Sequence, residues 1–71
     1  QAGSMAASDE REIIEQLEAL LEMAREGQVD GLMLAVETTD HWVLDNIGST
    51  NINQEKALEA ISRLEALCFF L

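Results

Sequence analysis

The N-terminal third of the chain carries apolar residues at helical spacing. Asp9 followed three positions later by Glu12 is a capping-box pattern, and Gly27 is the residue type that ends a helix. The pattern therefore predicts a helix over residues 9–26 with one face to bury. That face consists of Ile13, Ile14, Leu17, Leu20, Leu21 and Ala24.

The middle of the chain predicts a β-hairpin. Residues 32–36 are an apolar run too short for a good helix, and residues 42–47 form a second such run that Gly48 closes. The polar residues 38–41 between them predict a short reversal of the chain. An isolated two-stranded ribbon is marginally stable in water, so we expect helices on one face and a second subunit's strands at its edge.

The C-terminal segment predicts a second long helix. Asn51 with Gln54 can cap a helix that runs from about Ile52 to the end of the chain. Glu59 lies four residues before Arg63, the favourable order for a surface ion pair, which marks the solvent-facing side. Five apolar residues end the chain, and we expect them to be buried between subunits. The predicted oligomer interface comprises Ile61, Leu64, Cys68, Phe69, Phe70 and Leu71.

These elements predict an α+β fold of αββα order, with two helices packed on an antiparallel hairpin. A chain of 71 residues buries only about 60% of the surface that it exposes when unfolded. One cysteine and one histidine exclude an intrachain disulfide and are too few for a zinc site, so we expect a homodimer or larger assembly. Residues 1–4 are interpreted as an expression-tag remnant, and residues 5–71 as one domain.

The net charge of the chain limits the classes of partner that it is expected to bind. Fourteen acidic against four basic residues give a net charge of −10, so nucleic acid and anionic membrane should be repelled, and a basic protein surface is the favoured partner. No run reaches the roughly 18 apolar residues of a membrane span. With a single free thiol, the expected compartment is the cytoplasm.

The residues suited to chemistry do not form a recognisable catalytic or metal site. His41 is the only imidazole, and Cys68 has apolar neighbours that favour a buried packing role. The aspartates near the hairpin do not match a calcium loop, and the glycines do not form a phosphate loop. Glu37 is interpreted as a solvent-facing residue at a strand end. The protein is therefore predicted to be non-enzymatic, with no metal and no cofactor.

Four glutamates form the sharpest surface feature of the sequence. They are spaced three, four and four residues apart along the first predicted helix, which places them on one side of it. One interpretation is a docking row for a basic partner, including mimicry of a nucleic-acid backbone; the other is a solvated face that only keeps the protein soluble. The row comprises Glu15, Glu18, Glu22 and Glu26.

The hairpin offers an alternative function. His41 and Trp42 could contact a small ligand by stacking, with Arg25 among the few cations available for phosphates. The protein would then be a sponge that sequesters a small nucleotide signal in pockets between subunits. The competing interpretation places Trp42 in the core or in the oligomer interface.

Residues 24–32, with the sequence AREGQVDGL, lead from a Leu-rich helix into the hairpin and are followed by a second Leu-rich helix. This arrangement resembles small phage and prophage proteins of unassigned function. In type, the chain is similar to tiny acidic phage inhibitors of bacterial defence such as anti-CRISPR proteins. The resemblance implies a non-enzymatic, oligomeric inhibitor or adaptor that acts in the host cytoplasm.

Overall fold

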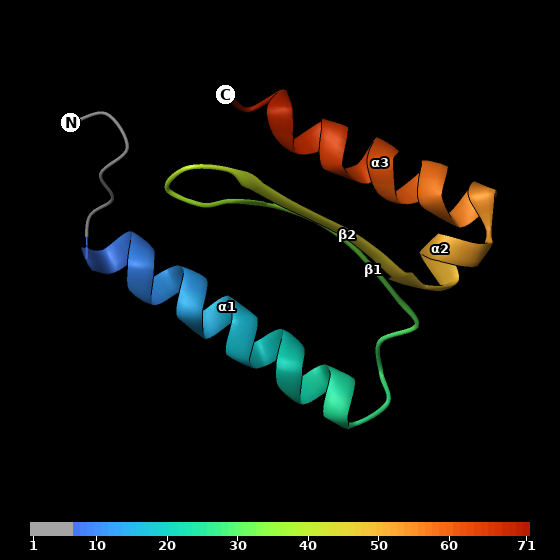
Figure 1. Cartoon of the computed structure of the whole chain (residues 1–71), viewed down its shortest axis with the longest axis horizontal. Helices are drawn as coiled ribbons and strands as arrows, with labels where there is room; N and C mark the ends of the chain where they lie inside the picture. The colour runs from blue at the N-terminus through green and yellow to red at the C-terminus, as the bar shows by residue number, and fades with distance from the viewer. Residues whose placement is uncertain (1–6) are drawn as a thin grey trace.

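A computed structural model describes residues 7–71, and the expectations for residues 1–4 and for a start at Met5 lie outside that range. Helix α1 (Ala7–Arg25) is followed by strands β1 (Gly31–Glu37) and β2 (Trp42–Gly48). A short helix α2 (Ser49–Ile52) and helix α3 (Gln54–Cys68) complete the chain. This order confirms the αββα arrangement. Figure 1 shows α1 on one side of the hairpin and α3 on the other, so the expectation that the helices lie on one face is wrong.

Helix α1 begins two residues earlier than the sequence pattern indicates. Asp9 is not the N-cap but lies in the first turn, where its negative charge favours the helix dipole. The end is as predicted: Gly27 has φ +74°, its N–H donates to Ala24 O at 3.0 Å, and Gln28 N donates to Met23 O at 3.0 Å. These two bonds form a Schellman motif, which glycine supports because it lacks a Cβ.

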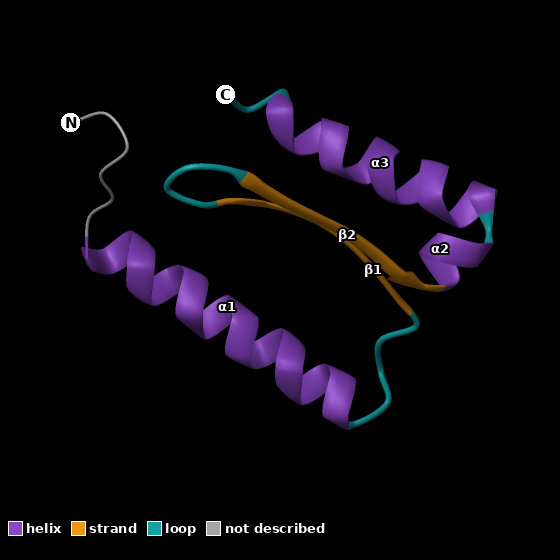
Figure 2. Cartoon of the chain, in the orientation of Figure 1, coloured by secondary structure: helices purple, strands orange, loops and turns teal. Residues whose placement is uncertain are grey.

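The hairpin is formed by β1 and β2 in antiparallel register, from Gly31 opposite Gly48 to Glu37 opposite Trp42. Figure 2 shows the two strands as one narrow ribbon with a loop at its tip. The predicted strands were each one or two residues shorter than those observed. Their positions and the reversal at residues 38–41 are confirmed.

The junction between hairpin and C-terminal helix differs from the expectation. The chain forms α2 directly after β2, and Thr50 of α2 exchanges two hydrogen bonds with the Asn46 side chain, at 2.7 and 3.1 Å. Helix α3 is capped by Asn53, whose side chain accepts from Glu55 N and Lys56 N, so the predicted cap at Asn51 is wrong. Asn51 and Asn53 lie only two residues apart, so sequence spacing alone does not show which of them caps α3.

The chain has no internal core between its elements. Within residues 7–71 no side chain is buried, and α2 is the element that contacts both strands and α3. Neither α1 nor α3 packs its length against the hairpin. The radius of gyration is 14.1 Å, against about 11 Å for a compact domain of this length. In the single chain, the helices and the hairpin therefore enclose no buried core among the described residues.

The surface area gives the same result. The chain exposes 6458 Å², whereas a compact protein of its mass exposes about 4,400 Å². A fully unfolded segment of six residues exposes about 800 Å². When that area is subtracted for residues 1–6, the exposed area still exceeds the compact value by at least about 1,200 Å². Most of the large apolar side chains are exposed. Trp42 is 61% exposed and Cys68 is also exposed, so neither is a core residue of the single chain.

Candidate functional site

The predicted glutamate row lies along α1 and is exposed throughout. Glu15, Glu18 and Glu22 belong to the helix, and Glu26 follows its last residue. Glu26 N still donates to Glu22 O at 3.1 Å, so the helical path continues through the end of the row. The structure therefore places the four carboxylates on one side of one element, as the spacing predicted.

The row carries uncompensated negative charge. Helix α1 contains six acidic and two basic residues, which gives a net charge of −4 before Glu26 is added. The ion pairs among residues 7–71 join Asp40 to His41 and Glu59 to Arg63, and neither involves the row. Parallel carboxylates without a cation repel one another, so a basic partner would stabilise them.

The opposite side of α1 is apolar and equally uncovered. At 100° per residue, the mean direction of Ile13, Leu17 and Leu20 lies about 180° around the helix from the mean direction of the glutamate row, and these three side chains are 47%, 60% and 45% exposed. A shallow groove between Asp9, Glu12, Ile13, Gln16 and Leu17 runs along this helix. Within residues 7–71, helix α1 thus has an apolar face that no other element covers and an acidic face whose glutamates form no ion pair.

The hairpin tip holds a local hydrogen-bond cluster. His41 Nδ1 lies 2.7 Å from Asp40 Oδ1 and 3.0 Å from Thr38 Oγ1, and the Thr38 hydroxyl also lies 2.7 Å from His41 O. Both the carboxylate and the hydroxyl contact the same imidazole nitrogen. A nucleophile–histidine–acid relay uses the two ring nitrogens separately, so this geometry stabilises the turn rather than activating Thr38.

The three proposed ligand-contact residues are not brought together. His41 and Trp42 are at the tip of the hairpin, whereas Arg25 is the last residue of α1, at the opposite end of the ribbon in Figure 1. A nucleotide that stacks on Trp42 would therefore find no guanidinium from Arg25 of the same chain. Glu37, opposite Trp42 in the register, is exposed at the end of β1 as predicted.

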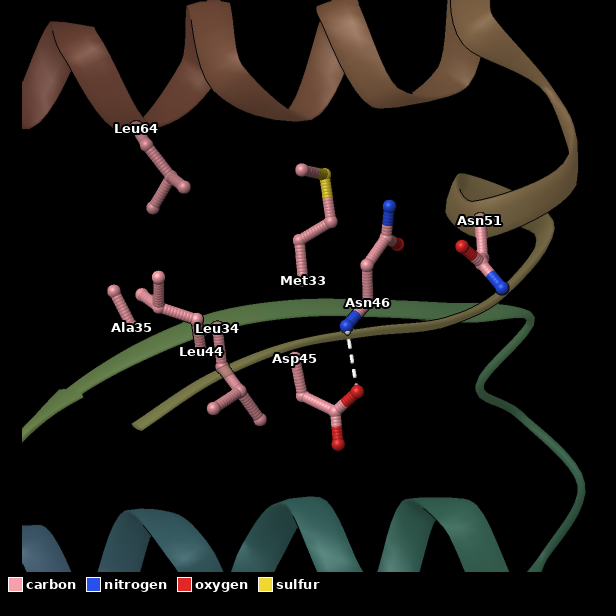
Figure 3. A pocket seen from close by; sticks show the side chains of 8 residues that line it. All are labelled: Met33, Leu34, Ala35, Leu44, Asp45, Asn46, Asn51 and Leu64. Carbon is pink, nitrogen blue, oxygen red and sulfur yellow. Dashed lines mark hydrogen bonds between the residues drawn. The ribbon is translucent and has the colours of Figure 1, made fainter. Parts of the chain in front are cut away.

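An open groove of about 600 Å³ separates the hairpin from α3, and no pattern in the sequence indicates it. In Figure 3, Met33 and Asn46 point toward α3, Leu64 points from α3 toward them, and Asp45 points to the other side. The lining contains no basic side chain and is mostly apolar, so it offers no positive charge to a phosphate. The full lining is Met33, Leu34, Ala35, Leu44, Asp45, Asn46, Asn51 and Leu64.

The predicted oligomer-interface residues are all accessible. Ile61 is 42% exposed, Leu64 faces the groove, and Phe69 and Phe70 are 85% and 88% exposed beyond the end of α3. The helix ends at Cys68 and not at the last residue, Leu71. Nothing within residues 7–71 covers these side chains, which is the condition that an interface between subunits requires.

Within residues 7–71 there is neither a metal-binding cluster nor a helix that could span a membrane. The described part of the chain contains no group of three or more His, Cys, Asp or Glu side chains placed to hold a metal ion. Among its helices, none combines the length and apolarity needed to cross a bilayer. No family model, no curated protein and no solved structure matches the sequence or the fold. The exposed surfaces of the molecule are therefore the features that bear on its function.

Proposed function

We propose that this protein is a small, non-enzymatic binding protein that self-associates and docks the acidic side of α1 on a basic protein surface. The glutamate row carries the proposal: its carboxylates are exposed, aligned and without an ion pair within residues 7–71. Electrostatic complementarity of this kind steers a partner and selects against acidic competitors. An inhibitor or adaptor of the kind that phages encode would use such a surface.

The two-sided character of α1 supports this assignment. Its apolar stripe requires burial, and burial of that stripe in an assembly leaves the opposite, acidic side facing outward. A helix held by its apolar side presents the glutamates on a rigid element, which lowers the entropic cost of docking. Solubility alone requires net charge but no alignment of that charge.

Two variants of equal net charge distinguish binding by the glutamate row from attraction by the overall charge. One variant carries Glu15→Gln, Glu18→Gln and Glu22→Gln; the matched control carries Glu37→Gln, Glu55→Gln and Glu65→Gln. Each variant removes three exposed charges and changes the net charge from −10 to −7. The probe is a Lys- and Arg-rich helical peptide, titrated by calorimetry at about 0.05 M and about 0.3 M salt.

The row variant should bind the peptide roughly tenfold more weakly and lose much of the salt dependence, because each exposed pair contributes about 0.2–1 kcal/mol. The control should retain most of the affinity of the wild type. Equal weakening of both variants would mean that net charge alone attracts the peptide, and the docking row would be rejected.

A further inference from the structure

Each strand of the hairpin directs the backbone groups of alternate residues away from its partner strand, toward an open edge. At the tip, Thr38 N donates to His41 O at 2.9 Å, and at the other end Ser49 N donates to Asp30 O at 2.8 Å. Bonded pairs alternate along an antiparallel ladder, so the even-numbered residues of β1 point their backbone groups inward. Met33 and Ala35 of β1, and Leu44 and Asn46 of β2, therefore point theirs outward.

The outer edge of β2 is blocked by its own side chain. Asn46 N donates to Asp45 Oδ1 at 2.9 Å, so one outward amide already has an acceptor and a carboxylate lies along this edge. A strand approaching β2 would meet a bonded donor and a negative charge, two devices that natural proteins use to prevent edge pairing. Within residues 7–71, no side-chain bond satisfies the outward amides of Met33 or Ala35 on β1.

The uncovered area is of the size that a second copy would bury. The excess of about 1,200–2,000 Å² per chain corresponds to about 2,400–4,000 Å² for two chains. Obligate homodimers bury about 2,000–5,000 Å² in total. A second copy of the chain has the same free edge. A closed two-fold interface requires such identical surfaces on its two subunits.

We propose that two copies pair β1 against β1 in antiparallel fashion, forming a four-stranded sheet in the order β2-β1-β1-β2. Full overlap places the two-fold axis at Leu34 and lets Met33 exchange both backbone bonds with the partner's Ala35. This inference deepens the self-association in the proposed function by naming the edge that mediates it.

The pairing joins the apolar faces of the two hairpins. Leu32, Leu34 and Val36 alternate onto one face of β1, and their cross-strand neighbours on that face include Val43 and Ile47. Asp45 lies opposite Leu34 on the same face and points toward the side where α1 runs in Figure 3. The shared sheet therefore presents an apolar face, formed by the two β1 strands and interrupted by Asp45 only on the outer strands, on which the stripes of the two α1 helices can be buried.

Proline substitutions test the edge directly. Ala35→Pro removes an outward N–H from β1 without removing an inward ladder bond, and Leu44→Pro does the same at the residue opposite it on β2. Light scattering should give twice the chain mass of 7.8 kDa for the wild type and for Leu44→Pro. Ala35→Pro should raise the dissociation constant roughly a hundredfold, because each dimer loses two hydrogen bonds.

Hydrogen exchange of the wild type gives a second measurement, independent of whether a proline variant folds. The Met33 and Ala35 amides should be protected, and dilution should remove that protection; the Leu44 amide should exchange rapidly at every concentration. A wild type that stays a single copy would overturn this inference together with the proposed self-association. A dimer that survives Ala35→Pro, with Met33 and Ala35 exchanging rapidly, would overturn only the assignment of the β1 edge.

Discussion

Gly48 links β2 to α2, and its replacement by alanine should be the most damaging small substitution in the hairpin. Its φ of +83° and ψ of −144° lie in a region that is essentially restricted to glycine. A Cβ at this position would also press against Asp30 O and lie 3.1 Å from Gly31 Cα. Both obstacles are backbone atoms, so relief requires the strands themselves to move.

The expected cost of Gly48→Ala follows from these two contributions. The backbone conformation costs about 1–3 kcal/mol for a residue with a Cβ, and forced contact with a packed neighbour costs about 1–3 kcal/mol more. A chain of 71 residues has a total stability of only about 4–11 kcal/mol. Gly48→Ala should therefore remove between a fifth and most of the free energy of unfolding.

Gly27→Ala is the matched control for this substitution. Gly27 also has a positive φ, +74°, but a Cβ there would meet no atom within 4 Å. It should therefore cost only about 1–2 kcal/mol, the penalty of the left-handed conformation. Urea unfolding of both variants at one protein concentration measures the difference. If Gly48→Ala were no more destabilising than Gly27→Ala, the close approach of Asp30 at the end of the hairpin would be refuted.

Two further predictions concern α3. Asn53→Ala removes the acceptor for Glu55 N and Lys56 N and should cost about 1 kcal/mol in urea unfolding; an unchanged midpoint would contradict the cap. The Arg63 guanidinium, 2.7 Å from the Glu59 carboxylate, lowers the pKa of Glu59 by hydrogen bonding and by its charge, with Lys56 adding to the effect. A depressed pKa means that this stabilisation is present above the unfolded-state value and is lost as pH falls through the folded-state value. In an NMR titration, Arg63→Gln should raise the pKa of Glu59 toward its ordinary range; no change would exclude the ion pair in solution.

Local pattern determined much of the fold because the physical causes are local. The apolar period near Leu17 and the glycine at position 27 were enough to place α1 and its end within two residues. The alternation of short apolar runs with a polar reversal gave both strands and the αββα order. The alignment of Glu18 and Glu22 on one side of α1 needed only helical geometry.

The errors fall where choices depend on neighbours in space. Asn51 and Asn53 are equally good caps by residue type, and the choice of Asn53 depends on α2, which packs against the hairpin through Asn46 and Thr50. The residue types of Trp42 and Cys68 predict burial, in a core or in an oligomer interface, yet both are exposed in the single chain. Whether burial occurs depends on how closely the elements approach, which no short-range pattern encodes.

Residue type and spacing are enough to establish the elements, their order, the acidic side of α1 and the excess of apolar residues. The three-dimensional arrangement is needed to show that the helices stand away from the hairpin, that Asp45 occupies the β2 edge and that the β1 edge is free. These facts depend on distances between segments remote in sequence. Within residues 7–71, local hydrogen bonds fix the secondary structure, while the apolar faces stay exposed because no described segment packs over them.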